Sequence, residues 1–250
     1  MGRMTPTAPT DLQPRCWAVL AGVALTGALA SMGLATLGLY PETRDQPSAL
    51  GGHPAGWAGV LPRAVDALAY FTHWSNLVVA VAAWRVARGG RPAAWERVLV
   101  LDALLMISIT ALVYAVVLAP AAQVTGWEHV TNPWVHVVTP VATVLLWLTL
   151  GPRGWLTWWA VPAALLLPLT WVVLTLARGA VVDQYPYGFV DVVQLGLGRV
   201  LVNVTAIVGL GVVVAALYRL VDGLLEPGRS HDRTPDPGDP DRGFCRAVDV

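Results

Sequence analysis

Long apolar runs alternate with short polar stretches along most of this chain. Six runs have the length of about 17–25 residues with which a helix crosses the hydrocarbon core of a bilayer. They lie at residues 17–39, 67–86, 98–118, 134–150, 155–177 and 199–218. The pattern predicts an all-α fold, a polytopic integral membrane bundle of six transmembrane helices.

The two ends of the chain differ from this middle part. Residues 1–16 are mostly polar, and residues 219–250 are rich in Asp, Pro, Gly and Arg, a composition that cannot bury a core. We therefore expect a disordered head, a transmembrane domain at 17–218 and a disordered tail. Residues 28–30, Ala-Leu-Ala, resemble a signal-peptidase site. The apolar run continues to Leu39, however, so a retained first helix is favoured.

Composition supports the membrane class. Of the 250 residues 56% are hydrophobic and 13% are charged, whereas soluble domains carry about 25% charged residues. The net charge is zero, so no basic surface points to nucleic acid, and the predicted partner is the lipid bilayer. Cys16 and Cys245 lie at opposite ends of the sequence and form neither a metal site nor a disulfide framework. We expect no metal and no cofactor.

The arginines predict how the bundle is oriented. An even number of spans places both termini on the same side of the membrane. Arginines are denser on that side, above all in the connection between the second and third runs, and the positive-inside rule then places both termini in the cytoplasm of a multi-pass cell-membrane protein. That connection carries Arg85, Arg88, Arg91 and Arg97, while the opposite side has Arg44, Arg63, Arg178 and Arg199.

Polar residues interrupt the second apolar run near its start, where residues 71–76 read FTHWSN. Polar groups inside a bilayer are costly unless they find partners, so they usually face a bundle interior or a water-filled cavity. Thr72, Ser75 and Asn76 share one helical face, because spacings of three and four residues return to the same side of a helix. This face forms one half of a predicted polar site.

The other half lies at the start of the fourth run. Asn132, His136, Thr139 and Thr143 are four, three and four residues apart, which places them on one face of one helix. Both runs are even-numbered, so they enter the membrane from the same side. Thr72 and His136 each lie about one turn inside their runs and are matched in depth. Asn132 and Thr139 are therefore predicted to support the same site.

A hydroxyl facing a neutral imidazole suggests a nucleophile and its base. A His that accepts the proton of Thr72 contributes roughly 10²–10⁴-fold to the rate, and the alkoxide then attacks a carbonyl carbon. Asn76, Ser75 and Tyr185 are candidate donors to the resulting oxyanion. The substrate predicted for such a pair, with Thr72 and His136 as catalytic residues, is a lipid ester taken from the bilayer.

Other functions remain open for the same residues. The polar faces can instead hold the helices of a non-catalytic protein together around a lipid or a small apolar ligand, since a membrane Thr or Ser often bonds the carbonyl one turn back. His73 and His136 could serve as axial ligands of a haem, although His73 also fits an anchor at the membrane interface. A transporter is disfavoured, because paired broken helices and a repeat are missing from the sequence pattern.

Three short motifs together resemble those of a known family. Residues 71–76 fit F-T-x-x-S-N, residues 132–137 (NPWVHV) fit N-x-x-x-H, and residues 185–186 are Tyr-Pro before the last run. In a six-span chain this set resembles the androgen-induced gene family of membrane proteins, and most of all its bacterial branch. Animal members are threonine-dependent hydrolases of fatty acid esters of hydroxy fatty acids and carry N-H-x-x-H-T at the second motif. The resemblance implies Thr72 as nucleophile and His136 as base.

Overall fold

The computed structural model describes residues 12–40 and 49–226, and within them the chain is helical, with a single β-bridge between Ala49 and Tyr185. The longer helices are α1 (Leu12–Thr36), α2 (Val60–Ala69), α3 (Phe71–Ala87), α4 (Ala94–Val113), α6 (Thr139–Leu150), α8 (Leu166–Val182) and α10 (Leu197–Leu225). Short helices are α5 (Glu128–Pro133), α7 (Ala160–Ala163) and α9 (Val192–Leu195). Two π-helical turns are η2 (Tyr114–Leu118) and η4 (Trp134–Val138); the 3₁₀ turns are η1 (Gly56–Gly59), η3 (Ala119–Ala121) and η5 (Gly188–Val190).

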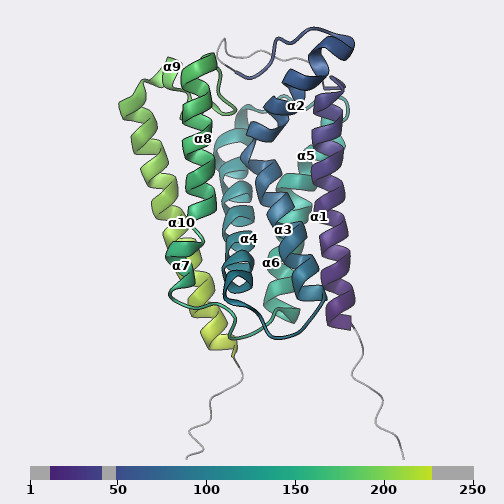
Figure 1. Ribbon diagram of the computed structural model, residues 1–250, viewed down its shortest axis with the longest axis vertical. Coiled ribbons are helices and arrows are strands. Elements are labelled where there is room, and N and C mark those ends of the chain that lie inside the picture. Colours follow the sequence, from purple (N-terminus) through teal and green to yellow (C-terminus); the bar gives the residue numbers. More distant parts are fainter. Residues whose placement is uncertain (1–11, 41–48, 227–250) are drawn as a thin grey trace, which may run out of the picture.

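The helices form one elongated bundle around α4, and α1 and α10 reach the same end of it (Figure 1). In the described part of the chain five helical segments are long and apolar enough to cross a membrane, namely Leu12–Thr36, Ala94–Leu118, Glu128–Leu150, Ala160–Val182 and Leu197–Leu225. In the segment that contains α4, 56% of the residues in its 18-residue apolar stretch are buried. In the corresponding stretches of the other four segments, the buried share is 17–28%. The core therefore sits on α4, and the other helices turn most of their apolar surface outward. The predicted all-α class is confirmed.

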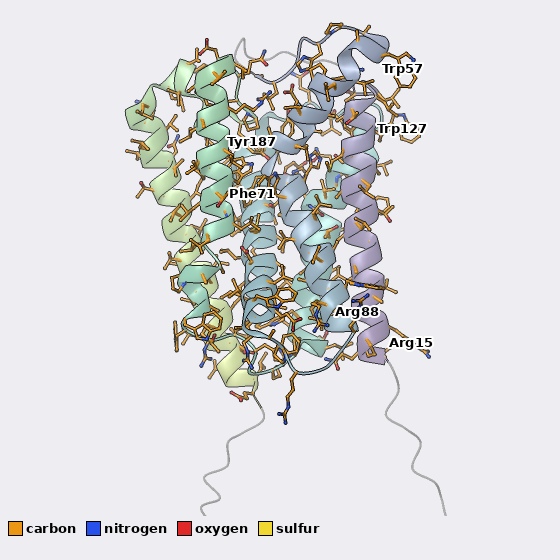
Figure 2. The ribbon with its side chains drawn as sticks, viewed as in Figure 1. Arg15, Trp57, Phe71, Arg88, Trp127 and Tyr187 are labelled. Carbon is orange, nitrogen blue, oxygen red and sulfur yellow. The ribbon has the colours of Figure 1, made fainter. Side chains whose placement is uncertain are left out.

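The outer surface has the chemistry of a protein that faces lipid. Large aliphatic side chains such as Val19, Val173 and Val202 are 65–68% exposed on the flanks of the bundle, an arrangement that a soluble monomer avoids. Tryptophans and charges lie at the ends. Figure 2 shows Trp57 and Trp127 at one end and Arg15 and Arg88 at the other. These are the features of an integral membrane protein, whose interfaces carry Trp and whose middle is apolar.

The run predicted as a helix at 67–86 is instead divided into α2 and α3. Tyr70 has an extended backbone, with φ −79° and ψ 125°, so the helix stops and a new one begins at Phe71. The N–H of Thr72 consequently has no carbonyl one turn earlier to bond, while the N–H of His73 bonds the carbonyl of Tyr70 at 3.1 Å. Residue 70 is neither Pro nor Gly, and the apolar run continues through it, so the sequence does not predict the break.

Other boundaries also differ from those predicted. The first helix begins at Leu12 rather than at residue 17, so part of the expected polar head is helical. The last helix continues to Leu225, seven residues beyond its expected end at 218. The rest of the predicted head and tail, including Cys245, lies outside the described residues.

Tyr185 packs so closely on α8 that only glycine fits beneath its ring. A Cβ built at Gly179 would lie 2.0 Å from Cε1 of Tyr185, whereas a Cβ at Gly22 in α1 would meet nothing within 4 Å. We predict that Gly179→Ala lowers the free energy of unfolding by about 1–3 kcal/mol, because overpacking of this kind forces side chains and backbone to shift. Thermal unfolding in detergent measures this, with Gly22→Ala as control. Equal melting temperatures for the two variants would contradict the close packing.

Candidate functional site

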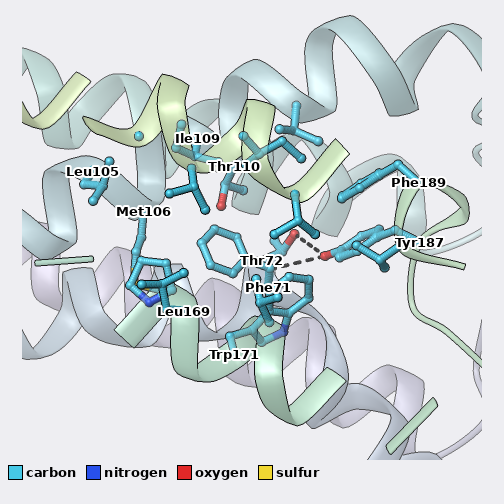
Figure 3. Close-up of a pocket in the computed structure, with 18 of the residues that line it drawn as sticks. Phe71, Thr72, Leu105, Met106, Ile109, Thr110, Leu169, Trp171, Tyr187 and Phe189 are labelled. Carbon is cyan, nitrogen blue, oxygen red and sulfur yellow. Dashed lines mark hydrogen bonds between the residues drawn. The ribbon is translucent and has the colours of Figure 1, made fainter. Parts of the chain in front are cut away.

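Thr72 lies at the broken end of a helix inside the bundle. It is the second residue of α3, and its side chain is only 7% exposed. Its backbone N–H faces the hydroxyl of Tyr187 at 3.5 Å, and its own Oγ1 lies 3.4 Å from the same hydroxyl. The break at Tyr70 thus presents a side-chain hydroxyl and an N–H of the first helical turn to the same small space (Figure 3).

His136 meets Thr72 from the opposite side. Its Nδ1 lies 3.0 Å from the carbonyl oxygen of Asn132, and its Nε2 lies 3.0 Å from Oγ1 of Thr72. A carbonyl can only accept, so the proton of a neutral ring sits on Nδ1 and Nε2 is left to accept from the Thr72 hydroxyl. The ring of Tyr114 stacks on the imidazole, with centroids 4.2 Å apart and planes inclined by 17°. The imidazole is held in the tautomer and orientation that a base needs.

The π-helical turn that carries His136 also provides a hydrogen-bond acceptor for α3. The N–H of Thr139 bonds the carbonyl of Trp134, five residues back, and Pro140 has no N–H to donate. The carbonyl of Val135 is therefore released from the helix, and Nδ2 of Asn76 donates to it at 3.2 Å. π-turns often occur at functional sites, because they free backbone groups in this way.

Ser75 and Asn76 support Thr72 rather than face a substrate. Oγ of Ser75 and Nδ2 of Asn76 both donate to the carbonyl oxygen of Thr72, at 2.9 and 2.8 Å. Thr110 in α4 donates in turn to Oγ of Ser75 at 2.8 Å. All three side chains are buried. The two residues predicted as oxyanion donors thus fix the backbone that carries the hydroxyl.

Tyr185, the third predicted donor, points elsewhere. Its side chain is 3% exposed and packs with Val190 and Val200 against Gly179. The phenol beside Thr72 belongs to Tyr187, two residues later. Burial raises the pKa of the Tyr187 phenol and keeps it in its neutral, donating form. Both tyrosines occur in the same Tyr-Pro-Tyr stretch. The sequence therefore indicates a phenol at the site but not which of the two tyrosines provides it.

The other predicted residues take different positions along the fourth span. Asn132 contributes its backbone carbonyl to His136, as described above, rather than its amide. Thr139 is fully buried, and its Oγ1 has no hydrogen-bond partner among the described residues; its carbonyl accepts from Thr143 at 2.7 Å. Thr139 and Thr143 of the predicted polar face are buried and Asn132 and His136 are partly exposed, and of the four residues only His136 lies within bonding distance of Thr72.

Two cavities of different polarity meet at Thr72, a larger one with a mixed polar and apolar wall, called here the polar cavity, and a smaller one with an almost wholly apolar wall. The polar cavity, of about 1020 Å³, lies toward the end of the bundle that carries Trp57, and its wall includes His53, His73 and His136. A narrow cavity of about 70 Å³ lies among α4, α8 and α10 and is lined almost entirely by apolar side chains. Figure 3 shows part of its lining, with Leu105, Met106, Ile109, Leu169 and Trp171 and, on the side of Tyr187, the Thr72 hydroxyl. Thr72 and Tyr187 belong to both cavities.

Ion pairs and hydrogen bonds of Asp66 and Arg63 connect the segments that surround the polar cavity. Asp66 receives a hydrogen bond from the guanidinium of Arg178, and its other oxygen lies 2.6 Å from Nε2 of His53. The guanidinium of Arg63 donates to three backbone carbonyls, those of Thr36, Pro54 and Gly56, at 2.7–2.9 Å. These bonds connect α1, α2, α8 and the loop at 49–56 around the cavity.

The geometry does not fit the haem hypothesis. An axial ligand needs a free ring nitrogen, but both nitrogens of His136 already form hydrogen bonds. Those of His73 are also occupied, by the carbonyl of Ala67 at 2.5 Å and by Oγ of Ser31 at 3.1 Å. His73 is 6% exposed and is therefore a buried residue of the bundle, not an anchor at its surface. Across residues 12–40 and 49–226, no group of three or more His, Cys, Asp or Glu side chains is arranged to hold a metal ion.

Comparison with known proteins identifies no relative of this chain. No protein-family model, no curated protein and no solved structure matches the chain.

Proposed function

We propose that this chain is an integral-membrane hydrolase of lipid esters, with Thr72 as the nucleophile and His136 as its base. The observation that carries the proposal is the 3.0 Å contact between Oγ1 of Thr72 and Nε2 of His136, together with the 3.0 Å contact between Nδ1 and the carbonyl of Asn132. A nucleophile, a base within hydrogen-bond reach and a third group that orients the base form the general signature of covalent catalysis by an alcohol.

The first chemical step moves one proton and forms one bond. Nε2 of His136 takes the proton of the Thr72 hydroxyl while Oγ1 attacks the ester carbonyl carbon, and the carbonyl oxygen becomes the oxyanion. The hydroxyl of Tyr187 and the backbone N–H of Thr72, which now faces that hydroxyl, are the donors nearest to it, and the positive end of the helix dipole adds to their effect. The imidazolium then protonates the leaving alkoxide, and an acyl-threonine remains.

Water completes the cycle by the same route. His136 takes a proton from a water molecule that enters from the polar cavity, and the hydroxide attacks the acyl carbonyl. The threonine oxygen leaves and recovers a proton from the imidazolium. The fatty acid is released and the enzyme returns to its starting state.

The two cavities support a lipid ester as substrate. An acyl chain gains about 0.8 kcal/mol for each CH₂ that leaves water, and the apolar cavity offers such a chain a path away from Thr72. The polar cavity has room for the leaving alcohol and for water. The ester bond would then lie at Thr72, where the two environments meet.

We further propose that α2 and α3 together form a sixth span, Val60–Ala87, and that both termini are cytoplasmic. Seven arginines of the described residues lie toward the end of the bundle at which α1 begins and α10 ends, against three toward the other end, which favours this orientation. The first group is Arg15, Arg85, Arg88, Arg91, Arg97, Arg153 and Arg219, and the second is Arg63, Arg178 and Arg199. The polar cavity then opens toward the outside of the cell.

A non-catalytic protein that binds a lipid or a small apolar ligand is the second candidate. The narrow apolar cavity favours it, because such a cavity can hold a ligand without chemistry. In that case the bond between Thr72 and His136 only joins two helices. Its loss would cost stability, about 1 kcal/mol for one hydrogen bond, and nothing else.

Substitution of the catalytic pair tests the hydrolase proposal. We predict that Thr72→Ala abolishes hydrolysis of long-chain lipid esters by the purified protein and that His136→Gln slows it roughly 10²–10⁴-fold, the usual contribution of a general base. Thr170→Ala serves as the matched control, because Thr170 is exposed on α8 and bonds only the carbonyl of Leu166 in its own helix. Hydrolysis by all three variants at the wild-type rate, or no hydrolysis of any lipid ester by the folded wild type, would contradict the proposal.

Acyl-chain selectivity tests the role of the apolar cavity. A Cβ at Gly211 would lie 3.6 Å from Leu105 and Leu165, so a leucine there can be accommodated while its branches fill the cavity. We predict that Gly211→Leu lowers kcat/KM at least about 10-fold for hexadecanoyl esters and leaves butanoyl esters nearly unchanged, since the space for several CH₂ groups is lost. Gly209→Leu, where a Cβ meets nothing within 4 Å, should change neither. An equal loss of kcat/KM for both chain lengths would show that the acyl chain does not bind in this cavity.

Chemical labelling of intact cells tests the proposed orientation. Cysteines are placed singly at Trp57 and at Arg88, which lie at opposite ends of the bundle (Figure 2), after Cys16 and Cys245 are replaced by Ser. We predict that a membrane-impermeant maleimide labels Trp57→Cys in intact cells and labels Arg88→Cys only after the cells are opened. The reverse pattern would place the termini outside.

A further inference from the structure

A second alcohol and a second imidazole meet in the wall of the polar cavity. Ser31 in α1 lies 3.1 Å from Nε2 of His73, the residue that follows Thr72. Nδ1 of His73 lies 2.5 Å from the carbonyl oxygen of Ala67 at the end of α2. That carbonyl can only accept, so the ring proton of the neutral imidazole is on Nδ1, and Nε2 accepts from the Ser31 hydroxyl.

This arrangement repeats the one at Thr72. In each case a backbone carbonyl of the preceding turn or helix orients the imidazole, whose Nε2 faces a hydroxyl. In each case a phenol also approaches that hydroxyl: Tyr187 lies 3.4 Å from Oγ1 of Thr72, and Tyr40 lies 3.5 Å from Oγ of Ser31. Tyr40 is positioned in turn by Thr131, 2.7 Å away.

The Ser31 hydroxyl is about as exposed as that of Thr72. Ser31 is 9% exposed and His73 is 6% exposed, beside 7% for Thr72. Ser31, His73, Tyr40 and Thr131 all line the polar cavity, and none of them lines the apolar one. A reagent at Ser31 therefore comes from the polar cavity, without an acyl chain threaded between α4 and α10.

We propose that Ser31 and His73 form a second nucleophile–base pair, which reacts with small polar acyl or phosphonyl compounds that enter the polar cavity. The proposal goes beyond the hydrolase function, because it requires neither Thr72 nor the apolar cavity.

The reaction with a fluorophosphonate is the simplest test case. Nε2 of His73 takes the proton of the Ser31 hydroxyl while Oγ attacks phosphorus. The O–P bond forms, the P–F bond breaks, and fluoride leaves with the electron pair of that bond. The imidazolium then releases its proton to water in the polar cavity, and a stable phosphonyl-serine remains. An ester with a short polar acyl group would follow the same path and lose its alcohol in place of fluoride.

The experiment uses the full-length protein in detergent and a fluorophosphonate attached to a polyethylene-glycol linker, with the modified residues located by peptide mass spectrometry. The Thr72→Ala variant removes the first nucleophile, so an adduct on Ser31 is measured by itself. Ser108 is the internal control, since its hydroxyl bonds the phenol of Tyr218 at 2.7 Å and faces no imidazole. Melting temperatures of all variants are measured in parallel.

We expect an adduct on Ser31 in the wild type and in Thr72→Ala, and none on Ser108. Adding His73→Gln to Thr72→Ala should slow labelling of Ser31 roughly 10²–10⁴-fold, the range for loss of a general base. Labelling of Ser31 that is absent, no faster than that of Ser108, or unchanged by His73→Gln would overturn the proposal. If the double variant does not fold, the ratio of Ser31 to Ser108 adducts in Thr72→Ala decides by itself.

The outcome is separable from that of the hydrolase proposal. An adduct on Ser31 without one on Thr72 in the wild type supports the second pair and counts against the first. An adduct on Thr72 alone does the reverse.

Discussion

The polar chemistry of this bundle depends on one constraint, that a polar group surrounded by apolar surface must find a partner within the protein. Two interruptions of regular helix create such groups at the same depth. The break at Tyr70 leaves the N–H of Thr72 without a backbone acceptor, and the π-turn η4 leaves the carbonyl of Val135 without a backbone donor. Side chains from neighbouring elements satisfy them, Tyr187 at the N–H of Thr72 and Asn76 at the carbonyl of Val135.

The same interruptions account for the geometry at Thr72. A continuous helix through Tyr70 would engage the N–H of Thr72 in its own ladder, and a regular α-helical turn would engage the carbonyl of Val135. Because both are released, α3 and η4 are joined by side-chain bonds, with Ser75 and Thr110 extending the network to α4. A hydroxyl held in such a network loses little entropy on adopting a reactive geometry, which is the advantage of preorganised sites.

Much of the architecture could be predicted from apolar periodicity, because the helices cross a medium that demands internally bonded backbone. Thr72 and His136 could be paired from their matched depth in two spans that run in the same direction. The break at Tyr70 could not be predicted, since the residues around it are apolar and no glycine or proline stands there. Its existence depends on tertiary partners for the freed backbone groups.

The details of the site that were missed have related causes. Tyr185 and Tyr187 are equivalent in sequence, and the close packing of Tyr185 on Gly179 decides which of them reaches Thr72. The sequence pattern fits His73 as an interfacial residue, because its partner Ser31 lies 42 residues earlier in a helix that has no polar stripe. Spacing within one helix reveals a shared face, but a contact between helices depends on their rotation about their own axes.

The reactivity of the Thr72 hydroxyl is the most direct measure of this description. Incubation of the folded protein with an alkyl fluorophosphonate, followed by peptide mass spectrometry, should find the phosphonyl group on Oγ1 of Thr72, and the adduct should form far more slowly when His136 is replaced by Gln. Protein that melts cooperatively but carries no adduct on Thr72, or carries it at the same rate without the imidazole, would contradict the assignment of the pair as nucleophile and base.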